Sequence, residues 1–452
     1  MASIKEQLFA AGLSETEAEA KQALFHTAEG GLRSIGGAVR AVRAAWFVPG
    51  RLEVFGKHTD YAGGRSLLAA VERGFCVVAR SRQDAEVNLC DAKSRDQVSF
   101  FVSTVPGPEQ HRWPRYARSV IRRVAHNFPF ARRGADISFA SDLPAATGLS
   151  SSSALIIAIF QVLSEANSLE QLPAFTENIH SKEDLAAYLA AIESGQSFCA
   201  FPGDEGVGTS GGSEDHTAIL CSVPHELAQY SFCPTRKEKA ISLPPECIFA
   251  IGASGVSAEK TGAALERYNR TAAAAQAVLE LWRRATGRTD ATLAAALNSS
   301  PHAPARLRGL LAGMDFAGFA AKALADRLDQ FFEESENLVP AAGDAIARKD
   351  WAALGQFADR SQIAAEKLLG NQVPETVALA RLAREAGAFA ASSFGAGFGG
   401  SVWALVPRES GGEFIRIWRE SYYSRFPERE ADSIFFLTNP GPAALRIDLA
   451  AV

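Results

Sequence analysis

The apolar residues in the first half of the chain change repeatedly between strand spacing and helix spacing, and this alternation most constrains the fold. Runs of β-branched and aromatic residues, broken by Gly, Asp and Ser, predict strands over residues 46–54, 66–81, 86–91 and 97–102. Further along, the spacing predicts helices over 113–127, 150–166 and 182–198 and a strand over 136–141. Because helices and strands are mixed within one segment, we expect an α+β fold whose sheet is mostly antiparallel.

The two ends of the chain extend this pattern. The first 45 residues are expected to be helical, with Ser14 as an N-cap. An alanine-rich helical region follows from residue 257 to about 384, with interruptions at 301–304 and Gly313. The remaining predicted elements are strands over 216–222, 230–233, 247–253, 402–406, 433–437 and 445–449 and a helix over 413–423. A chain of 452 residues is long enough for two lobes, which we predict to be 1–235 and 236–452.

Charge and cysteine usage exclude several classes of partner. Lys+Arg 46 against Asp+Glu 51 gives a net charge of −5, which provides no attraction to nucleic acid or to anionic lipid. No apolar run reaches the ~18 residues that a membrane-spanning helix needs, and the N-terminal residues lack the apolar core of a signal peptide. The six cysteines include no C-x-x-C pair, so we expect reduced thiols and a cytoplasmic location.

A polar cluster follows the first predicted strand, in the segment PGRLEVFGKHTDYAGG at residues 49–64. Lys57, His58, Thr59, Asp60 and Tyr61 place several hydrogen-bonding side chains in a short stretch, which suits a polyhydroxylated ligand. A solvated polar turn explains the same residues equally well.

A second cluster, DLPAATGLSSSSAL at residues 142–155, leads from a Pro and Gly loop into four serines that begin an apolar helix. The unpaired backbone N–H groups of a helix N-terminus attract phosphate, and a serine hydroxyl is available for a metal ion. Ordinary N-capping by Ser150 would need only one of the four serines.

Two further segments are rich in glycine. SSFGAGFGGSVWAL at residues 392–405 allows the backbone to approach a ligand or another loop closely, although a tight hairpin is the simpler explanation. PGDEGVGTSGGS at 202–213 has no apolar periodicity and is expected to form a mobile loop that closes over the site.

Together, these motifs resemble the galactokinase branch of the GHMP kinase superfamily, which is named for galactokinase, homoserine kinase, mevalonate kinase and phosphomevalonate kinase. The first is similar to P-G-R-V-N-L-I-G-E-H-T-D-Y-N-G-G, the second to P-x-G-x-G-L-S-S-S-A and the third to G-x-G-F-G-G before a strand. The resemblance spans nearly the whole chain. It implies an ATP- and Mg²⁺-dependent kinase acting on the anomeric hydroxyl of galactose, with two lobes and the active site in the cleft between them.

The resemblance also implies roles for single residues. In G-G-S-E-D-H at 211–216, Asp215 corresponds to the family's catalytic base, and Arg51 is its partner. Glu214 is expected to point elsewhere in an extended segment. The implied sugar contacts are Lys57, His58, Asp60 and Tyr268, and the implied metal ligands are Ser152 and Glu193. The implied phosphate-binding residues are Gly148, Leu149, Ser150, Ser151, Ser152 and Ser153, and the structural glycines of the third motif are Gly397, Gly399 and Gly400.

Two positions depart from the family pattern. Ala146 replaces a glycine of the phosphate loop, which crowds the loop slightly but leaves ATP binding expected. Lys57 replaces a glutamate that reads hydroxyls at the far end of the sugar, and a lysine there is able to pair with a carboxylate. A uronic acid such as galacturonate is therefore the alternative substrate.

A non-catalytic sugar sensor is the second alternative, because some relatives bind sugar and ATP only to regulate a partner. The presence of both Asp215 and Arg51 argues against it. The expected partners are a small sugar and ATP, with the protein itself a monomer or a small homo-oligomer.

Overall fold

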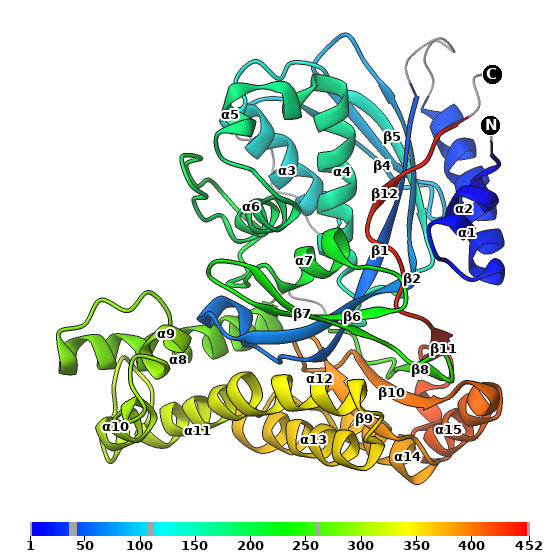
Figure 1. Cartoon of the computed structure of the whole chain (residues 1–452). Helices are drawn as coiled ribbons and strands as arrows, with labels where there is room; N and C mark the ends of the chain where they lie inside the picture. The colour runs from blue at the N-terminus through cyan, green and yellow to red at the C-terminus, as the bar shows by residue number, and fades with distance from the viewer. Residues whose placement is uncertain (1, 36–42, 106–112, 259–261, 450–452) are drawn as a thin grey trace.

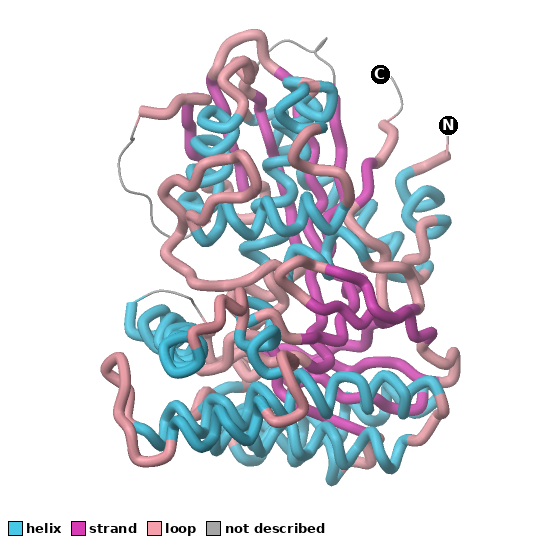
Figure 2. The backbone as a smooth tube through the Cα atoms, turned by 60° about the vertical axis from the view of Figure 1, so that its left-hand side comes forward, coloured by secondary structure: helices cyan, strands magenta, loops and turns pink. Residues whose placement is uncertain are grey.

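The computed structural model describes residues 2–35, 43–105, 113–258 and 262–449 and contains two β-sheets (Figure 1). The larger has eight strands and the smaller four. Strands of both sheets run through the middle of the molecule, and helices lie outside them (Figure 2). The structure is therefore of the α+β class, as predicted.

The eight-stranded sheet is built mostly from the N-terminal half of the chain. Its path is β12-β1-β2-β5-β3-β4, and β6 pairs with both β2 and β7. Every pair is antiparallel except β3 with β5, which confirms the predicted mostly antiparallel sheet. The strands are β1 (Arg43–Phe55), β2 (Arg65–Ser81), β3 (Glu86–Asp91), β4 (Gln97–Phe101), β5 (Ala135–Ser141), β6 (Glu226–Ser231), β7 (Arg236–Ser242) and β12 (Leu445–Arg446).

Helices cover both faces of the large sheet (Figure 1). On one face α1 (Ile4–Ala10) and α2 (Glu15–Ser34) bury Phe25 and Leu32 against side chains of β1 and β2. The opposite face is covered by α3 (Pro114–Asn127), α4 (Ser151–Asn167), α5 (Pro173–Thr176) and α6 (Lys182–Ser194). Every residue of α4 from Ser153 to Ser164 is buried, because sheet and helices enclose it. The phosphate loop at its N-terminus is thus attached to the rigid centre of the lobe.

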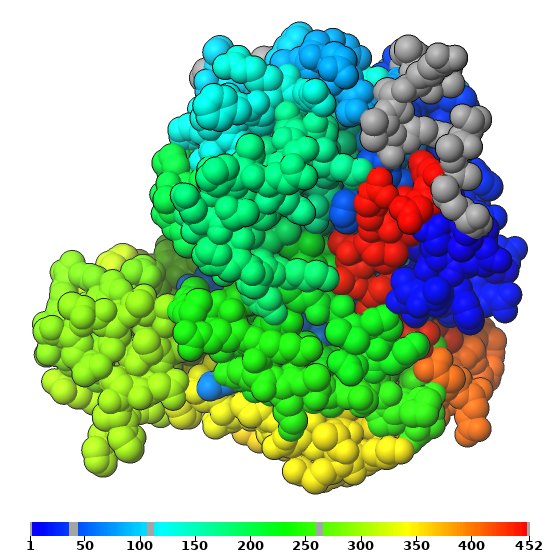
Figure 3. Space-filling model, turned by 45° about the horizontal axis from the view of Figure 1, so that its top comes forward, coloured from blue at the N-terminus to red at the C-terminus, as the bar shows by residue number. Residues whose placement is uncertain are grey.

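The four-stranded antiparallel sheet has the order β11-β8-β10-β9. Its strands are β8 (Cys247–Ala253), β9 (Ala390–Phe394), β10 (Ser401–Pro407) and β11 (Ile434–Thr438), and α12 (Val339–Ala347), α13 (Trp351–Ala364), α14 (Pro374–Glu385) and α15 (Gly411–Arg425) accompany it. A separate helical arm with its own core projects to one side in Figures 1 and 3, and consists of α8 (Gly262–Thr286), α9 (Leu293–Leu297), α10 (Ala303–Leu311) and α11 (Ala321–Phe332). The predicted division of this region into several packed helices is confirmed.

One predicted strand is wrong. The segment over 216–222 belongs to helix α7 (Glu214–Cys221). The segment HTAILC has the continuous apolar pattern of a strand, because every residue from His216 to Leu220 is buried and the helix has no polar face there. The hydroxyl of Thr217 donates to the carbonyl of Ser213, one helical turn back. As a consequence, Glu214 and Asp215 form the first turn of a helix instead of alternating along a strand.

The predicted lobe boundary at residue 235 falls inside a hairpin. Strands β6 and β7 lie on either side of it and pair with each other in the large sheet. The chain also returns at its end, where β12 pairs with β1. Neither β7 nor β9 was predicted from the sequence. Of the helices in the described ranges, none is both long and apolar enough to cross a bilayer.

Candidate active site

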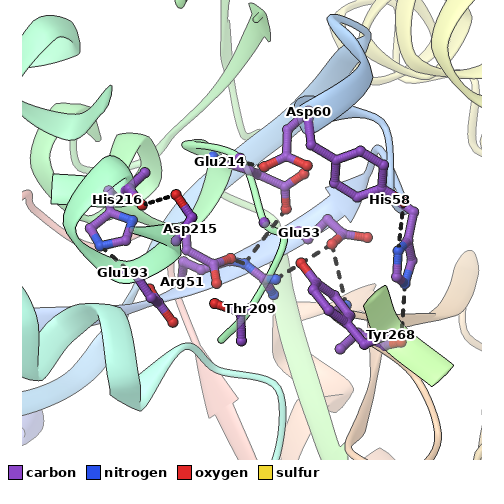
Figure 4. Close-up of a pocket in the computed structure, with 17 residues that line it drawn as sticks. Arg51, Glu53, His58, Asp60, Glu193, Thr209, Glu214, Asp215, His216 and Tyr268 are labelled. Carbon is purple, nitrogen blue, oxygen red and sulfur yellow. Dashed lines mark hydrogen bonds and ion pairs between the residues drawn. The ribbon is translucent and has the colours of Figure 1, made fainter. Parts of the chain in front are cut away.

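A pocket lies where the end of β1, the start of α7 and the glycine-rich segment after β9 meet (Figure 4). Its charged and polar lining comes from elements far apart in the sequence. The residues that line it are Arg51, Glu53, His58, Asp60, Tyr61, Ala190, Glu193, Ser194, Thr209, Gly211, Gly212, Glu214, Asp215, His216, Tyr268, Gly395 and Ala396.

Arg51 lies at the centre of the pocket, as Figure 4 shows. It is 4% exposed, and its Nε is 2.5 Å from Oδ1 of Asp215. Its Nη1 donates to the carbonyl of Gly148 at 2.8 Å, and its backbone N–H donates to the carbonyl of Leu149 at 3.1 Å. One arginine therefore joins the predicted base to the predicted phosphate loop.

Two further carboxylates that were not predicted flank the same guanidinium. Oε2 of Glu53 is 3.5 Å from Nη2 of Arg51, and Oε1 of Glu214 is 3.6 Å from its Nε. Burial opposes the positive charge of Arg51, but Asp215, Glu53 and Glu214 outweigh burial and raise the pKa of the guanidinium. The expectation that Glu214 points away is wrong, because residue 214 begins a helix. A charged residue inside the apolar strand LEVF was the available signal for Glu53.

Three of the predicted sugar-binding residues line one side of the pocket. His58 lies against the ring of Tyr268, with ring centroids 5.3 Å apart, and its two nitrogens contact the hydroxyl of Tyr61 and the carbonyl of Ala396, each at 3.0 Å. Oδ2 of Asp60 accepts the backbone N–H of Glu214 at 3.2 Å, so Asp60 also holds the start of α7. Burial raises the pKa of Tyr268 well above its usual value, so its hydroxyl stays protonated. The sugar-binding roles of these residues stay predictions.

Lys57, the fourth predicted sugar contact, does not line the pocket. Its side chain is buried, and Nζ donates to the hydroxyls of Ser361 at 2.6 Å and Ser392 at 2.9 Å. Ser361 in turn donates to Glu334, whose Oε1 also accepts the backbone N–H of Gly56 at 2.9 Å. Glu334 lies in a π-helical segment, Glu333–Leu338, between α11 and α12. The ammonium thus has partners within the protein, and the predicted contact between Lys57 and a substrate carboxylate stays a prediction.

The predicted phosphate loop lies between β5 and α4 and contains residues with positive φ. Ala146 adopts φ 53°, a left-handed conformation that costs a non-glycine residue about 1–2 kcal/mol. Ser150, at φ 59°, precedes α4 without a side-chain capping bond, so simple N-capping does not explain it. The first turn of α4 begins with three further serines, shortly after Gly148, whose carbonyl Arg51 contacts, and this arrangement suits phosphate binding.

The third motif packs directly on this loop. The hydroxyl of Ser401 donates to the carbonyl of Thr147 at 2.7 Å, and a side chain at Gly400 or Gly395 would come within 3.2 or 3.3 Å of backbone oxygens of the phosphate loop. Gly397 and Gly399 have positive φ and leave no room for a Cβ, which would lie 2.4 Å from the carbonyl of Asn371 or 2.7 Å from that of Val256. The glycines therefore serve close packing between loops.

The serine that faces Glu193 is Ser153, one residue beyond the predicted Ser152. Its hydroxyl donates to Oε2 of Glu193 at 3.1 Å, and Nε2 of His216 lies 3.6 Å from the same oxygen. Oε1 of Glu193 is buried without a hydrogen-bond donor among the described residues. Oxygen ligands of this kind suit Mg²⁺, which keeps most of its ligands as water and substrate phosphates. No group of three or more His, Cys, Asp and Glu side chains within the described ranges is arranged to hold a metal.

The loop expected to be mobile is attached to helix α3 along much of its length. Arg122 forms two hydrogen bonds with Asp204, at 2.8 and 3.0 Å, and Arg118 pairs with Glu205 at 3.0 Å. Arg115 donates to the carbonyl of Val207. Of the residues that follow, Thr209, Gly211 and Gly212 line the pocket. This arrangement makes α3 an anchor for one wall of the pocket.

Arg122→Ala is expected to release this loop, because it removes the two hydrogen bonds to Asp204. Local opening would rise and limited proteolysis would cut between residues 195 and 207 at least several times faster than in the wild type. Burial alone would raise the pKa of Asp204, but its hydrogen bonds to Arg122 outweigh burial and lower it. Wild-type protein should therefore lose the same attachment only when the pH falls through that lowered pKa. Equal cleavage rates at neutral pH would contradict this anchoring.

Three family models match separate parts of the chain, and each match contains one of the three motifs. The model described as the galactokinase galactose-binding signature matches residues 36–81, the GHMP kinases N terminal domain matches 115–203 and the GHMP kinases C terminal matches 344–424. The chain belongs to the galactokinase branch of the GHMP kinases. It is accordingly a carbohydrate kinase, and the resemblance predicted from the motifs is confirmed.

Curated galactokinases resemble this GHMP kinase over most of their length. That of Chloroflexus aurantiacus is 29% identical over 383 residues, covering 83% of this chain and 87% of its own. That of Roseiflexus sp. is 26% identical over 387 residues, covering 83% and 86%. Among solved structures, Lactococcus lactis galactokinase complexed with galactose has a TM-score of 0.76 at 20% identity, covering 94% of this chain and 100% of its own. A mevalonate kinase has a TM-score of 0.54 at 14% identity, covering 89% and 100%. These two structures support the fold of the branch.

Proposed function

We propose that this kinase transfers the γ-phosphoryl group of ATP to the anomeric hydroxyl of galactose or a closely related neutral aldose. The observation that carries the proposal is the 2.5 Å contact between Arg51 and Asp215 in a pocket that also contains His58, Asp60 and Tyr268. The contact between Arg51 and the phosphate loop supports it, because the base and the phosphoryl donor must lie side by side for transfer.

In the proposed reaction, the carboxylate of Asp215 accepts the proton of the anomeric hydroxyl while that oxygen attacks the γ-phosphorus and the bond to ADP breaks. Asp215 lies in the first turn of α7, where the helix dipole favours its ionised form. Arg51 holds the carboxylate in place and, being adjacent to the phosphate loop, opposes the negative charge that develops on the transferring group.

We propose that Ser153 and Glu193 hold Mg²⁺, with Gly148, Leu149 and the serines from Ser150 to Ser153 around the phosphates. The donor-free oxygen of Glu193 supports this assignment. When bound, the ion would neutralise phosphate charge.

The pocket favours a neutral sugar over a uronate. Lys57 is directed away from the pocket, whereas Glu53, Asp60, Glu214 and Asp215 all line it. A substrate carboxylate would therefore be repelled by several negative charges. Among the lining residues, Arg51 is the only lysine or arginine that would attract it. Sugar hydroxyls, in contrast, are able to donate hydrogen bonds, which the carboxylates accept.

The test is ATP turnover by the purified protein with galactose, galacturonate, glucuronate, arabinose, glucose and N-acetylgalactosamine. Galactose should be phosphorylated at the anomeric oxygen, and the uronates should react at least about 100-fold more slowly in kcat/KM, since an unfavourable buried charge costs several kcal/mol. Turnover of ATP with none of these sugars would contradict the proposed function.

Lys57→Met is expected to reduce stability without changing sugar preference. The loss of two buried hydrogen bonds should lower the free energy of unfolding by about 1–3 kcal/mol, measured by denaturant unfolding. The ratio of kcat/KM for galactose to that for galacturonate should stay within about threefold of the wild-type ratio, because a threefold change is less than 1 kcal/mol. A rise in that ratio would show that Lys57 reads the substrate carboxylate.

We also propose a cytoplasmic location, supported by six free cysteines. The prediction of a monomer or small homo-oligomer stays open to measurement in solution.

A further inference from the structure

Glu53 and Glu214 form a pair of buried acids next to the proposed catalytic residues. Their residues are 3% and 4% exposed. Oε1 of Glu53 and Oε1 of Glu214 are each buried without a donor among the described residues. Buried carboxylate oxygens with no donor are costly, so this arrangement calls for an explanation in terms of charge.

The remaining oxygens of the pair have donors, which fixes both side chains. The hydroxyl of Ser66 donates to Oε2 of Glu214 at 2.7 Å, and the backbone N–H of Gly395 donates to Oε2 of Glu53 at 3.3 Å. Both acids also contact the guanidinium of Arg51, whose Nη2 lies 3.5 Å from Oε2 of Glu53 and whose Nε lies 3.6 Å from Oε1 of Glu214. Ionised carboxylates are acceptors only, so a proton on one of them would give the pair a donor that the surrounding described residues do not supply.

We propose that Glu53 and Glu214 share a single proton at neutral pH and act as a positioning pair that leaves Arg51 free to hold Asp215. The inference rests on the proposed function only for its catalytic consequence. The shared proton itself is inferred from the burial of the two acids, their donor-free oxygens and their common contact with Arg51.

Charge balance around Arg51 explains why the proton matters. Glu53, Glu214 and Asp215 surround one guanidinium, so full ionisation would place three negative charges against one positive charge. With the proton shared, Asp215 at 2.5 Å has by far the closest contact with Arg51. Without it, all three carboxylates would compete for the same N–H groups.

Charged groups on the neighbouring elements also influence the ionisation of Glu53 and Glu214. Asp60, from the short helical turn after β1, and Asp215 on α7 oppose ionisation of Glu214, and Glu334 opposes that of Glu53. Arg51 favours ionisation of both acids, and Lys57 favours that of Glu53. Burial is the largest influence, and the net effect raises the pKa of Glu53 and raises that of Glu214 well above its usual value.

The pH dependence has a definite sign. The folded protein holds this proton at pH values where the unfolded chain has lost it, so stability falls as the pH rises from the usual glutamate pKa to the raised pKa of the pair. Catalysis should decline over the upper part of the same range, because Arg51 is then shared among three carboxylates.

The first experiment compares pH profiles of kcat and kcat/KM for the wild type, Glu214→Gln and Glu53→Gln. Glutamine is neutral and its amide is able to donate to the remaining carboxylate, as the protonated acid does. The wild-type kcat should fall about tenfold per pH unit above the pKa of the pair, which is the slope for loss of one proton. Each variant should lack this fall, whatever its absolute rate. The same alkaline fall in both variants would overturn the proposal.

The second experiment does not depend on catalysis. Infrared spectra of wild-type protein with ¹³C-labelled glutamate carboxyl groups should contain a protonated carboxyl band at pH 7 that disappears only at higher pH. Thermal unfolding should give Glu214→Gln a midpoint that rises relative to the wild type as the pH increases. Absence of the band would overturn the proposal even if the enzyme were fully active, and its presence in a protein that phosphorylates no sugar would contradict only the proposed function.

Glu72→Gln provides a matched control. Glu72 is equally buried, but its carboxylate accepts the backbone N–H of Ser14 and both the backbone and side-chain N–H groups of Asn439. In Glu72→Gln, the amide N–H groups of the glutamine would face N–H groups of Ser14 or Asn439, so this variant should be destabilised at neutral pH. If the unfolding midpoint of Glu72→Gln, relative to the wild type, also rose with pH, the effect would not be specific to Glu53 and Glu214. That result would count against the proposed pair.

Discussion

Replacing Asp215 with asparagine is expected to lower kcat by about 10²–10⁴-fold, the usual contribution of a general base. The asparagine has almost the same size, and its oxygen is still able to accept a hydrogen bond from Nε of Arg51, so the pocket should keep its shape. The amide, however, cannot accept the proton of the anomeric hydroxyl. The loss should therefore appear in kcat, while ATP affinity changes little.

Steady-state kinetics and nucleotide titration of Asp215→Asn check this result. Asp432→Asn is a suitable control, because Asp432 is exposed and outside the pocket, and it should retain wild-type kcat. Unchanged turnover in Asp215→Asn would rule out Asp215 as the base. A wild-type protein that binds sugar and ATP without any turnover would instead indicate a non-catalytic sensor.

Replacing Arg51 with methionine is expected to abolish turnover and to lower the free energy of unfolding by about 3–5 kcal/mol, the usual cost of removing one partner of a buried ion pair. Methionine fills much of the same volume, so lost packing contributes little. The main cost comes from three acids left in a buried site without their cation. The destabilisation should shrink as the pH falls, because protonation then removes the uncompensated charges.

Denaturant unfolding of Arg51→Met at several pH values measures this effect. Arg419→Met serves as the control, since Arg419 is exposed on α15 and its replacement should change stability by no more than about 0.5 kcal/mol. A destabilisation of Arg51→Met that stays constant with pH would contradict an electrostatic cause and would point to packing.

The sequence predicts the first sheet well because its strands have strong and uninterrupted patterns. The predicted strand over 86–91 has the same bounds in the structure, and those of β1 and β2 differ by only a few residues. Strand β7, RKEKAIS, was missed because most of its side chains are exposed and charged, so it lacks a buried face that would produce a pattern. Helix α7 was mistaken for a strand because burial on several sides removes the polar face that marks a helix.

The motifs predicted which residues gather at the site, but not the direction of every side chain. Arg51, His58, Asp60, Asp215 and Tyr268 all line one pocket. Lys57, between them in sequence, does not line the pocket, and its ammonium donates instead to Ser361 and Ser392, about 300 residues along the chain. The acid pair could not be predicted for a similar reason. The pair forms only because folding brings Glu53 on β1 and Glu214 on α7 to the same guanidinium, and these residues are far apart in the sequence.

Strand β12 also sets the order in which the protein is able to assemble during translation. Trp46 and Phe47 on β1 pair with Arg446 and Leu445, Ile447 is buried beside them, and Gln7 on α1 bonds to Asp448. In Figure 3 the red C-terminal segment lies against the blue N-terminal residues. Until residues 445–448 leave the ribosome, β1 presents an open hydrogen-bonding edge. The lobe that is made first is therefore closed last, and a chain interrupted shortly before this strand carries an edge that is prone to pair with other molecules.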